Sequence, residues 1–200
     1  MNAGSDRVSL PLDAPIWGRF FTVFPLVLVG TREPDGGHDL APKHMAMPMS
    51  WQNWFGFVCT PRHATHRNAE RTGAFTVSYP RPDQVVQTAL AAAPRCDDDS
   101  KPSLQAMPIT EATRVDGVLV TGSPVGLECE LDRVVKGLGE NSLLIGRVVA
   151  AHVDRAALRT DDLDDADLLL QSPLFSYLYP GRFAVISNTQ AFPMPAGFKR

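Results

Sequence analysis

The stretch from Asp39 to Gly73 constrains the fold of this chain more than any other part of the sequence. It begins as a Pro- and Met-rich loop, continues as the apolar run Trp54–Cys59, which has the composition of a buried strand, and ends in a turn rich in hydroxyl and basic groups at 60–68. A turn that opens a helix presents backbone N–H groups with partial positive charge. The order of loop, buried strand and helix start predicts a site for a phosphorylated planar ligand.

Several short motifs in this region resemble those of the flavin reductase-like family of FMN-binding split barrels. That family tends to carry Asp-Gly, then Asn-x-Ala-Pro, an apolar strand, Arg or Ser ahead of a Thr and an Asn, and Thr-Gly-x-Phe-x-Val. The matching residues here are Asp35-Gly36, Leu40-Ala41-Pro42, the run 55–59, Arg62, Thr65, Asn68 and the segment 72–77. Asp39 stands where the family usually has Asn, and Lys43-His44 where an aromatic residue and Ser are common, which leaves the cofactor expectation in place and the substrate open.

The resemblance implies a mainly β fold, an antiparallel, Greek-key-like barrel of the FMN-binding split-barrel type with a few flanking helices. It also implies a flavin-dependent oxidoreductase that binds FMN, less often FAD, and transfers hydride from NADH or NADPH to flavin or a small acceptor. A homodimer with the flavin near its interface and a possible monooxygenase partner follow from the same resemblance. We expect an N-terminal arm at 1–14, one domain at 15–190 and a C-terminal tail at 191–200.

The segment 60–68 supplies the candidate phosphate ligands. Arg62 can hold a phosphate through two parallel N–H···O bonds, and the Thr60 and Thr65 hydroxyls and the first-turn amides can complete the shell. We expect His63 to be either a bystander or a wall of the site, and Asn68 to fix the local turn. The alternative is an ordinary capped helix with solvated basic side chains, but the preceding buried strand and Ala-Pro loop favour phosphate binding.

The run 43–47 supplies the candidate ring contacts of the cofactor: Lys43, His44, Met45, Ala46 and Met47. A flavin needs backbone donors and acceptors at its pyrimidine edge and apolar cover over its ring, and Met side chains pack adaptably against flat aromatics. A positive charge on Lys43 or His44 would stabilise the anionic reduced flavin. Alternatively, the Met residues are ordinary core and Lys43-His44 is an exposed loop pair.

A zinc site is a weaker hypothesis for the same region. Cys59, His63 and His66 are thiolate and imidazole ligands at helical spacing. They are only three ligands, however, Cys59 ends a buried run, and a helix directs the two His side chains along different bearings. We therefore expect no resident metal.

No catalytic residue follows from the sequence. It lacks Gly-x-Ser-x-Gly and a Gly-x-Gly-x-x-Gly after a strand, so neither a nucleophile elbow nor a Rossmann domain is indicated. His152, between apolar residues on a predicted strand, is more typical of a hydrogen-bonded core histidine than of a proton donor. The competing function is a non-catalytic FMN-binding or storage protein of the same fold, and a zinc-dependent enzyme is the third.

Composition narrows the class of protein. With 44% hydrophobic and 20% charged residues, the 200-residue chain has the make-up of a globular domain. A net charge of −3 argues against nucleic acid or an anionic membrane as partner. Three cysteines without repeated spacing favour reduced thiols in the cytoplasm. The start of the chain has no cationic segment followed by an apolar core, so we expect no secretion signal.

The remaining pattern predicts a string of strands and short helices. We expect a strand at 16–31 broken at Pro25, a turn at 33–37, a helix from Arg62 that ends at Gly73, a helix at 83–93 and a surface loop at 94–107. The other expected elements are a strand at 74–79, a hairpin whose strands include 127–131 and 142–153, a helix capped by Thr160, and a short strand at 183–186.

Overall fold

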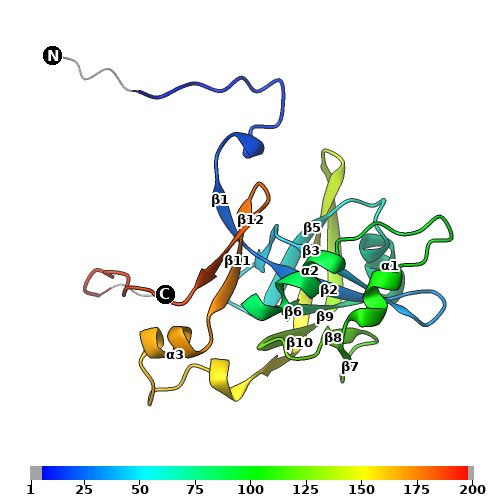
Figure 1. Cartoon of the computed structure of the whole chain (residues 1–200). Helices are drawn as coiled ribbons and strands as arrows, with labels where there is room; N and C mark the ends of the chain where they lie inside the picture. Colours follow the sequence, from blue (N-terminus) through cyan, green and yellow to red (C-terminus); the bar gives the residue numbers. More distant parts are fainter. Residues whose placement is uncertain (1–5, 198–200) are drawn as a thin grey trace.

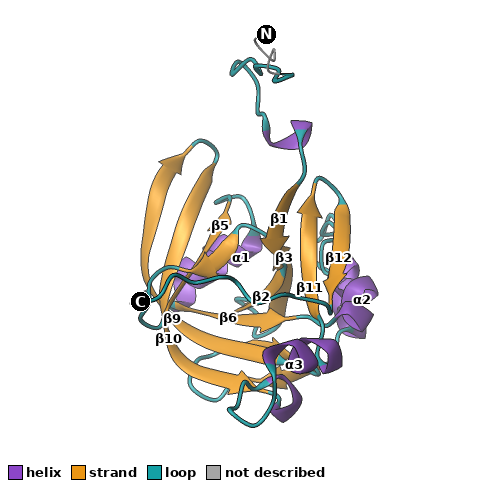
Figure 2. Ribbon diagram, turned by 90° about the vertical axis from the view of Figure 1, so that its left-hand side faces the viewer, coloured by secondary structure: helices purple, strands orange, loops and turns teal. Residues whose placement is uncertain are grey.

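A curled, antiparallel seven-stranded sheet forms the body of the protein. The computed structural model describes residues 6–197. The strands follow the order β3-β2-β6-β9-β10-β5-β4 across the sheet (Figures 1 and 2). They are β2 (Val27–Arg32), β3 (His38–Lys43), β4 (Ala46–Pro48), β5 (Trp54–Cys59), β6 (Ala74–Tyr79), β9 (Val125–Leu138) and β10 (Asn141–Val153). The prediction of a mainly β, antiparallel half-barrel is confirmed.

The β9–β10 hairpin is the longest element, and its tip rises beyond the rest of the sheet (Figure 1). Three irregularities in register bend the two strands, which lets the sheet curl. The predicted hairpin is therefore confirmed, as are the predicted strands at 54–59 and 74–79.

A second sheet of three strands stands beside the first. It consists of β1 (Thr22–Pro25), β11 (Leu174–Tyr179) and β12 (Arg182–Ile186), in the order β1-β11-β12. The predicted break in the first strand is confirmed, because β1 ends at Pro25 and β2 begins at Val27. The sequence analysis missed β11, whose residues become a strand by pairing with segments far away in the chain.

Short helices cover parts of the sheets. They are α1 (Ala64–Thr72), α2 (Val85–Leu90), α3 (Asp165–Gln171) and the 3-10 turns at 17–19, 82–84, 102–106 and 155–157. Helix α1 stops at Gly73, whose left-handed φ of 69° supplies the predicted helix end. The expectation that Thr160 caps the third helix was wrong, because Asp164 is the N-cap and its carboxylate accepts from the Ala166 amide. A two-stranded ribbon, β7 (Ile109–Glu111) with β8 (Val118–Val120), completes the fold.

The expectation of a loop at 39–50 was also wrong. Residues 38–43 pair along the whole of β2, and 46–48 pair with β5. Pro42 and Pro48 are tolerated because β3 and β4 are the two edge strands of the sheet, where a missing N–H costs no ladder bond. The consequence for the site is that Asp39 and Lys43 stand on a rigid strand rather than on a flexible loop.

Two apolar clusters lie on either side of β2. One is centred on Phe55, Phe57 and Phe75, and the other on Leu28, Leu40 and the segment after α2. Gly30 marks a close approach of β2 to β8 on the side of the second cluster, because an added Cβ would lie 2.5 Å from the Val118 carbonyl oxygen. The second cluster fastens the 94–107 segment to β3 and places it beside the start of α1.

Candidate functional site

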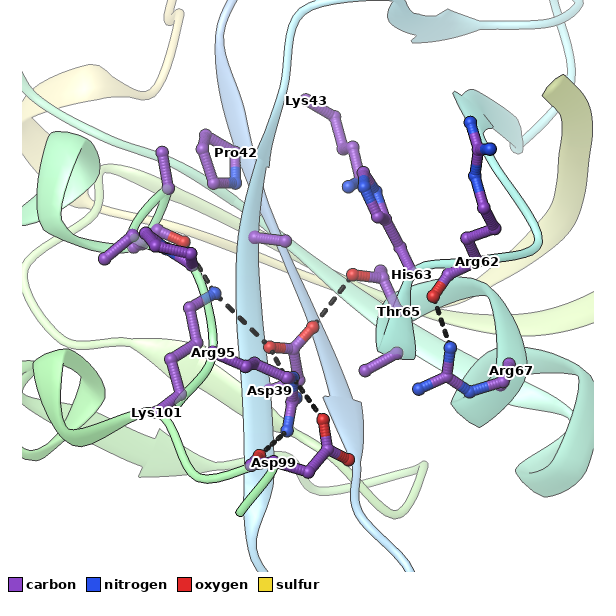
Figure 3. A pocket seen from close by; sticks show the side chains of 16 residues that line it. Asp39, Pro42, Lys43, Arg62, His63, Thr65, Arg67, Arg95, Asp99 and Lys101 are labelled. Carbon is purple, nitrogen blue, oxygen red and sulfur yellow. Dashed lines mark hydrogen bonds and ion pairs between the residues drawn. The ribbon is translucent and has the colours of Figure 1, made fainter. Parts of the chain in front are cut away.

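A basic pocket opens where β3, the start of α1 and the segment after α2 meet (Figure 3). Its volume is about 410 Å³, within the range of roughly 300–1,000 Å³ usual for small-molecule sites. The charged and polar side chains that line it are Asp39, Lys43, Arg62, His63, Thr65, Arg67, Arg95, Asp99 and Lys101. These residues define what we call the basic pocket below.

The pocket is positively charged although the chain is not. Five Lys or Arg side chains and two Asp carboxylates line it, a formal charge of +3, whereas the whole chain carries −3. The pKa of His63 is lowered by burial and then by the charge on Lys43, so the ring stays neutral at pH 7. A cavity of this kind concentrates anions.

The start of α1 faces this cavity. Its first amides, at Ala64 and Thr65, have no carbonyl four residues back within the helix, and both residues line the pocket. The N-cap position is held by His63, whose side chain makes no capping bond. The helix therefore offers N–H donors and the positive end of its dipole to the cavity.

Asp39 lies at the centre of the pocket floor with 2% of its surface exposed. Its Oδ2 accepts from the Thr65 hydroxyl at 2.8 Å, and its Oδ1 accepts from Arg95 at 3.1 Å and from Lys101 at 3.4 Å (Figure 3). A buried carboxylate needs such partners, because an isolated charge inside a protein is costly. The Thr65 hydroxyl has a single hydrogen to donate, and it is directed at Asp39.

Lys101 and Arg95 bring the 94–107 segment into the site. The Lys101 ammonium also donates to the Ala91 carbonyl at 2.7 Å and to the Leu40 carbonyl at 3.0 Å. Arg95 pairs with Glu33 and donates to the Asp99 carbonyl at 2.7 Å. Burial lowers the pKa of Lys101, and the charge of Asp39 opposes that shift. The segment expected to be a surface loop is thus tied to β3 and forms one wall of the pocket.

Lys43 is the buried cation of the pocket that has no carboxylate partner among the described residues, whereas Arg67, which also has none, is exposed. Lys43 is 8% exposed, and within residues 6–197 it forms no ion pair. Lys43 lies near the Cys59 thiol, whose pKa is raised by burial and lowered in part by the charge of Lys43. Lys43 and Arg62 extend to the same side of the opening (Figure 3). A buried, unpaired ammonium is a strong attractor for an anionic ligand.

The structure brings some of the predicted phosphate ligands together and separates others. Arg62, His63 and Thr65 line the basic pocket, whereas Thr60 and Asn68 do not. The Thr60 hydroxyl accepts from the Arg62 amide at 3.5 Å, and the Asn68 amide donates to Thr31 at 3.3 Å. Arg62 itself is exposed and pairs with Glu140. Their roles toward a ligand stay predictions.

The predicted ring contacts are divided between two surroundings. Lys43 faces the basic pocket, but His44 lies among the rings of Phe24, Tyr177 and Tyr179 at centroid distances of 5.4, 5.1 and 5.6 Å. The alternative of an exposed loop pair is therefore wrong for both Lys43 and His44. The pKa of His44 is lowered by burial and by the charge of Lys43.

The other three residues of the run differ in exposure. Ala46 is buried, while Met45 and Met47 are 43% and 58% exposed. The reading of these two Met residues as ordinary core is thus wrong. These two exposed Met side chains do not line the basic pocket, but they remain available to a planar ligand or to a second subunit.

The sequence analysis missed Arg95, Lys101 and the role of Asp39. The available signal was Asp39 itself, since a carboxylate inside an apolar segment predicts cationic partners elsewhere in the chain. Arg95 and Lys101 flank the acidic run 97–99, and an acidic run of this kind is typical of a solvated surface loop. Only the packing of this segment on β3 selects them.

The zinc hypothesis finds no support in the geometry. Cys59 Sγ lies 3.9 Å from His63 Nδ1, a separation that two ligands of one zinc ion could have, but the third candidate, His66, contacts Glu70 instead. In the part of the chain that the structure describes, no three His, Cys, Asp or Glu side chains form a group that could hold a metal ion. His152 is half exposed and lies 2.8 Å from Glu128, so it is not a core histidine.

Comparison with known proteins gives one family match. The model of the flavin reductase-like domain matches residues 19–178, which is most of the chain. None of the helices in residues 6–197 is long and apolar enough to cross a membrane.

Solved structures share the fold at low sequence identity. Flavoredoxin of Desulfovibrio vulgaris is 21% identical with a TM-score of 0.76, and the match covers 96% of this chain and all of that one. A protein named as a flavin reductase with split barrel domain, from Shewanella frigidimarina, is 18% identical with a TM-score of 0.74, over 86% and 87% of the two chains. Nitrilotriacetate monooxygenase component B from Bacillus cereus is 20% identical with a TM-score of 0.78, over 93% and 98%. These similarities confirm the split-barrel fold.

Proposed function

The chain belongs to the flavin reductase-like family and is an NAD(P)H-dependent flavin oxidoreductase, and from this premise we propose that it uses FMN and holds the FMN phosphate in the basic pocket. The observation that carries the proposal is Lys43, a buried ammonium without a carboxylate partner, beside the free amides of a helix start. Together they match the chemistry of a phosphate monoester.

The residues of the pocket fit that group. A phosphate dianion requires several N–H donors and local positive charge, and the pocket supplies a formal +3 charge in a chain of −3. Lys43 and the amides of Ala64 and Thr65 would hold the phosphate, with Arg62 free to approach once it leaves the exposed Glu140. FMN ends in such a monoester, whereas in FAD the same phosphate is joined through a pyrophosphate bond to AMP and has no dianionic end, which favours FMN.

The loop between β3 and β4 would carry the ring end of the cofactor. When bound, a flavin accepts hydride at its N5 atom, which is chemistry that the protein itself does not supply. The protein would orient the ring and cover it with apolar side chains such as Met45 and Met47.

Steady-state oxidation of NADH and of NADPH, with and without added FMN, tests this function. We expect FMN-dependent turnover above the free-flavin background, and about tenfold weaker FMN binding in Lys43→Met, the effect of one lost charged hydrogen bond. Lys136→Met is the matched control, because Lys136 is an exposed lysine paired with Glu70 outside the pocket. A protein that binds FMN without any turnover would instead be a flavin storage protein.

A homodimer is part of this proposal. The segment 6–21 runs away from the body (Figures 1 and 2), and it and the three-stranded sheet expose large apolar side chains. These side chains include Trp17, Phe21, Val23, Leu174, Phe183 and Val185. Large apolar side chains that are left exposed in this way are typical of an interaction surface, and a second copy of the chain would cover them. Sedimentation velocity should give twice the mass of the 21.8 kDa chain, and a monomer at micromolar concentration would contradict this.

Other attributes of the protein remain predictions. The similarity to a monooxygenase component makes a monooxygenase a candidate recipient of the reduced flavin. A cytoplasmic location accords with three cysteines that form no disulfide. The arm at 1–14, domain at 15–190 and tail at 191–200 likewise stay predictions, as does the choice between NADH and NADPH.

A further inference from the structure

We propose that Asp39 is a positioning residue that holds the 94–107 segment, through Arg95 and Lys101, as the cationic wall of the basic pocket, and so sets the affinity of the pocket for a phosphate monoester. This inference rests on the proposed function of the pocket. It assigns to a carboxylate, placed where the family usually has Asn, the task of recruiting two positive charges to an anion site.

The contacts of Asp39 support this role. Its two oxygens serve partners from two different elements, since Thr65 belongs to α1 whereas Arg95 and Lys101 belong to the segment after α2. The carboxylate is 2% exposed and the Lys101 side chain is 9% exposed, so water screens their attraction little. The Asp39 carboxylate and the side chains of Arg95 and Lys101 therefore form one network, in which the position of each group depends on the others.

The remaining anchors of Lys101 are weaker, whereas Arg95 keeps a second charged partner in Glu33. Apart from Asp39, Arg95 is held by the partly exposed Glu33 and by Asp99 of its own segment, and Lys101 by two neutral carbonyls. Bonds between two charged groups are about twice as strong as those to neutral acceptors. Removal of the Asp39 charge would leave Lys101 buried without a counterion, and the segment would move to let the ammonium reach water.

The sign of the effect distinguishes this proposal from a simpler view. If Asp39 acted only by its own negative charge near the phosphate, Asp39→Asn would tighten FMN binding, because a repulsive charge would be lost. If Asp39 positions Arg95 and Lys101, the same substitution weakens FMN binding, because two cations leave the wall. Asn has nearly the same shape and can still accept from Thr65, so packing is preserved.

The experiment compares Asp39→Asn with wild type by two measurements. The first is hydrogen exchange of residues 94–107 without flavin, and the second is titration with FMN and with riboflavin, which has no phosphate. We expect exchange in this segment to rise about tenfold, FMN to bind about tenfold more weakly and riboflavin to bind unchanged, as for one lost charged interaction. Asp165→Asn is the control, because Asp165 is an exposed carboxylate paired with Arg159 away from the pocket.

Two further variants guard against a folding defect of Asp39→Asn. Arg95→Gln and Lys101→Gln remove the cations from the segment, and each should reproduce the selective loss of FMN affinity. In the double variant of Asp39→Asn with Lys101→Gln, the loss of FMN binding free energy should be smaller than the sum of the losses in the two single variants. Both substitutions break the same interaction, so it can be lost only once.

Unchanged or tighter FMN binding in Asp39→Asn, or equal losses for FMN and riboflavin, would overturn the proposal, as would unchanged exchange in 94–107. The failure of the proposed function looks different. In that case wild type would not favour FMN over riboflavin at all, while the exchange measurement would still report whether Asp39 holds the segment.

Discussion

Glu128 on β9 gives the sharpest prediction about stability. Its side chain is 0% exposed, and its oxygens accept from the Thr113 amide and hydroxyl at 2.9 Å each, from the amides of Arg114 and Val115, and from His152 Nε2 at 2.8 Å. Burial alone would raise the pKa of Glu128, but these hydrogen bonds lower it from 4.5 to about 2. The charged carboxylate thus fastens the turn between β7 and β8 to the main sheet.

The size of the effect follows from that pKa. A fall of about 2.5 pKa units corresponds to about 3 kcal/mol of stability that the folded state gains from the ionised group. Because the folded pKa is the lower one, this stability is present above pH 4.5 and is lost as the pH falls toward 2. In Glu128→Gln an NH₂ group, which cannot accept a hydrogen bond, replaces one of the oxygens that face these N–H donors. The stabilisation by the ionised carboxylate is therefore absent at every pH.

Urea unfolding of wild type and Glu128→Gln at pH 7 and pH 3 measures this difference. We expect the variant to be less stable by about 3 kcal/mol at pH 7 and by about 1 kcal/mol at pH 3. Glu130→Gln is the control, since Glu130 lies two residues on, exposed, with only a surface pair to Arg147. A difference below 1 kcal/mol at pH 7, or the same difference at both pH values, would refute the reasoning.

Two other predictions concern the core and the thiols. Gly30→Ala should lower the free energy of unfolding in urea by about 1–3 kcal/mol, because the added methyl would lie 2.5 Å from the Val118 carbonyl oxygen. Gly18→Ala is the control and should lower it far less, because Gly18 has open space around it. Equal losses in the two variants would contradict the packing described for β2. In the native protein the exposed Cys96 should be the thiol that reacts quickly with a disulfide reagent. Cys59 and Cys129 are buried, and burial raises the pKa of both thiols, that of Cys129 to about 12. Fast labelling that persists in Cys96→Ser would show that this account of the buried thiols is wrong.

Much of the sheet could be predicted because its strands carry their own pattern. The runs 54–59 and 74–79 are apolar and β-branched or aromatic, and they are bounded by turn residues, so local preference and tertiary pairing agree. The end of α1 was equally local, because Gly73 can adopt the left-handed conformation that stops a helix.

The segments that were missed depend on distant partners. Residues 38–43 contain Pro42 and two charged side chains, and they are a strand only because β2 pairs with them. Likewise β11 lies between β1 and β12, which start more than 150 residues apart. Local preference carries no information about such pairings.

The residues of the candidate site also fall into those that local sequence predicts and those that depend on distant partners. Lys43, Arg62, His63 and Thr65 were found because they lie in one short stretch with a recognisable order. Arg95 and Lys101 were not, because their place in the pocket depends on a buried ion network centred on Asp39. Charges that meet only after folding leave no periodic trace in the sequence.

Titration of the purified protein with FMN and with riboflavin, followed by flavin fluorescence, is the most direct test of the central claim. The two ligands differ only in the phosphate, and the claim is that the basic pocket binds that phosphate. We predict that FMN binds about a hundredfold more tightly or better, as expected for two or more charged hydrogen bonds. Equal affinity for both ligands, or no binding of either, would contradict the assignment of the pocket.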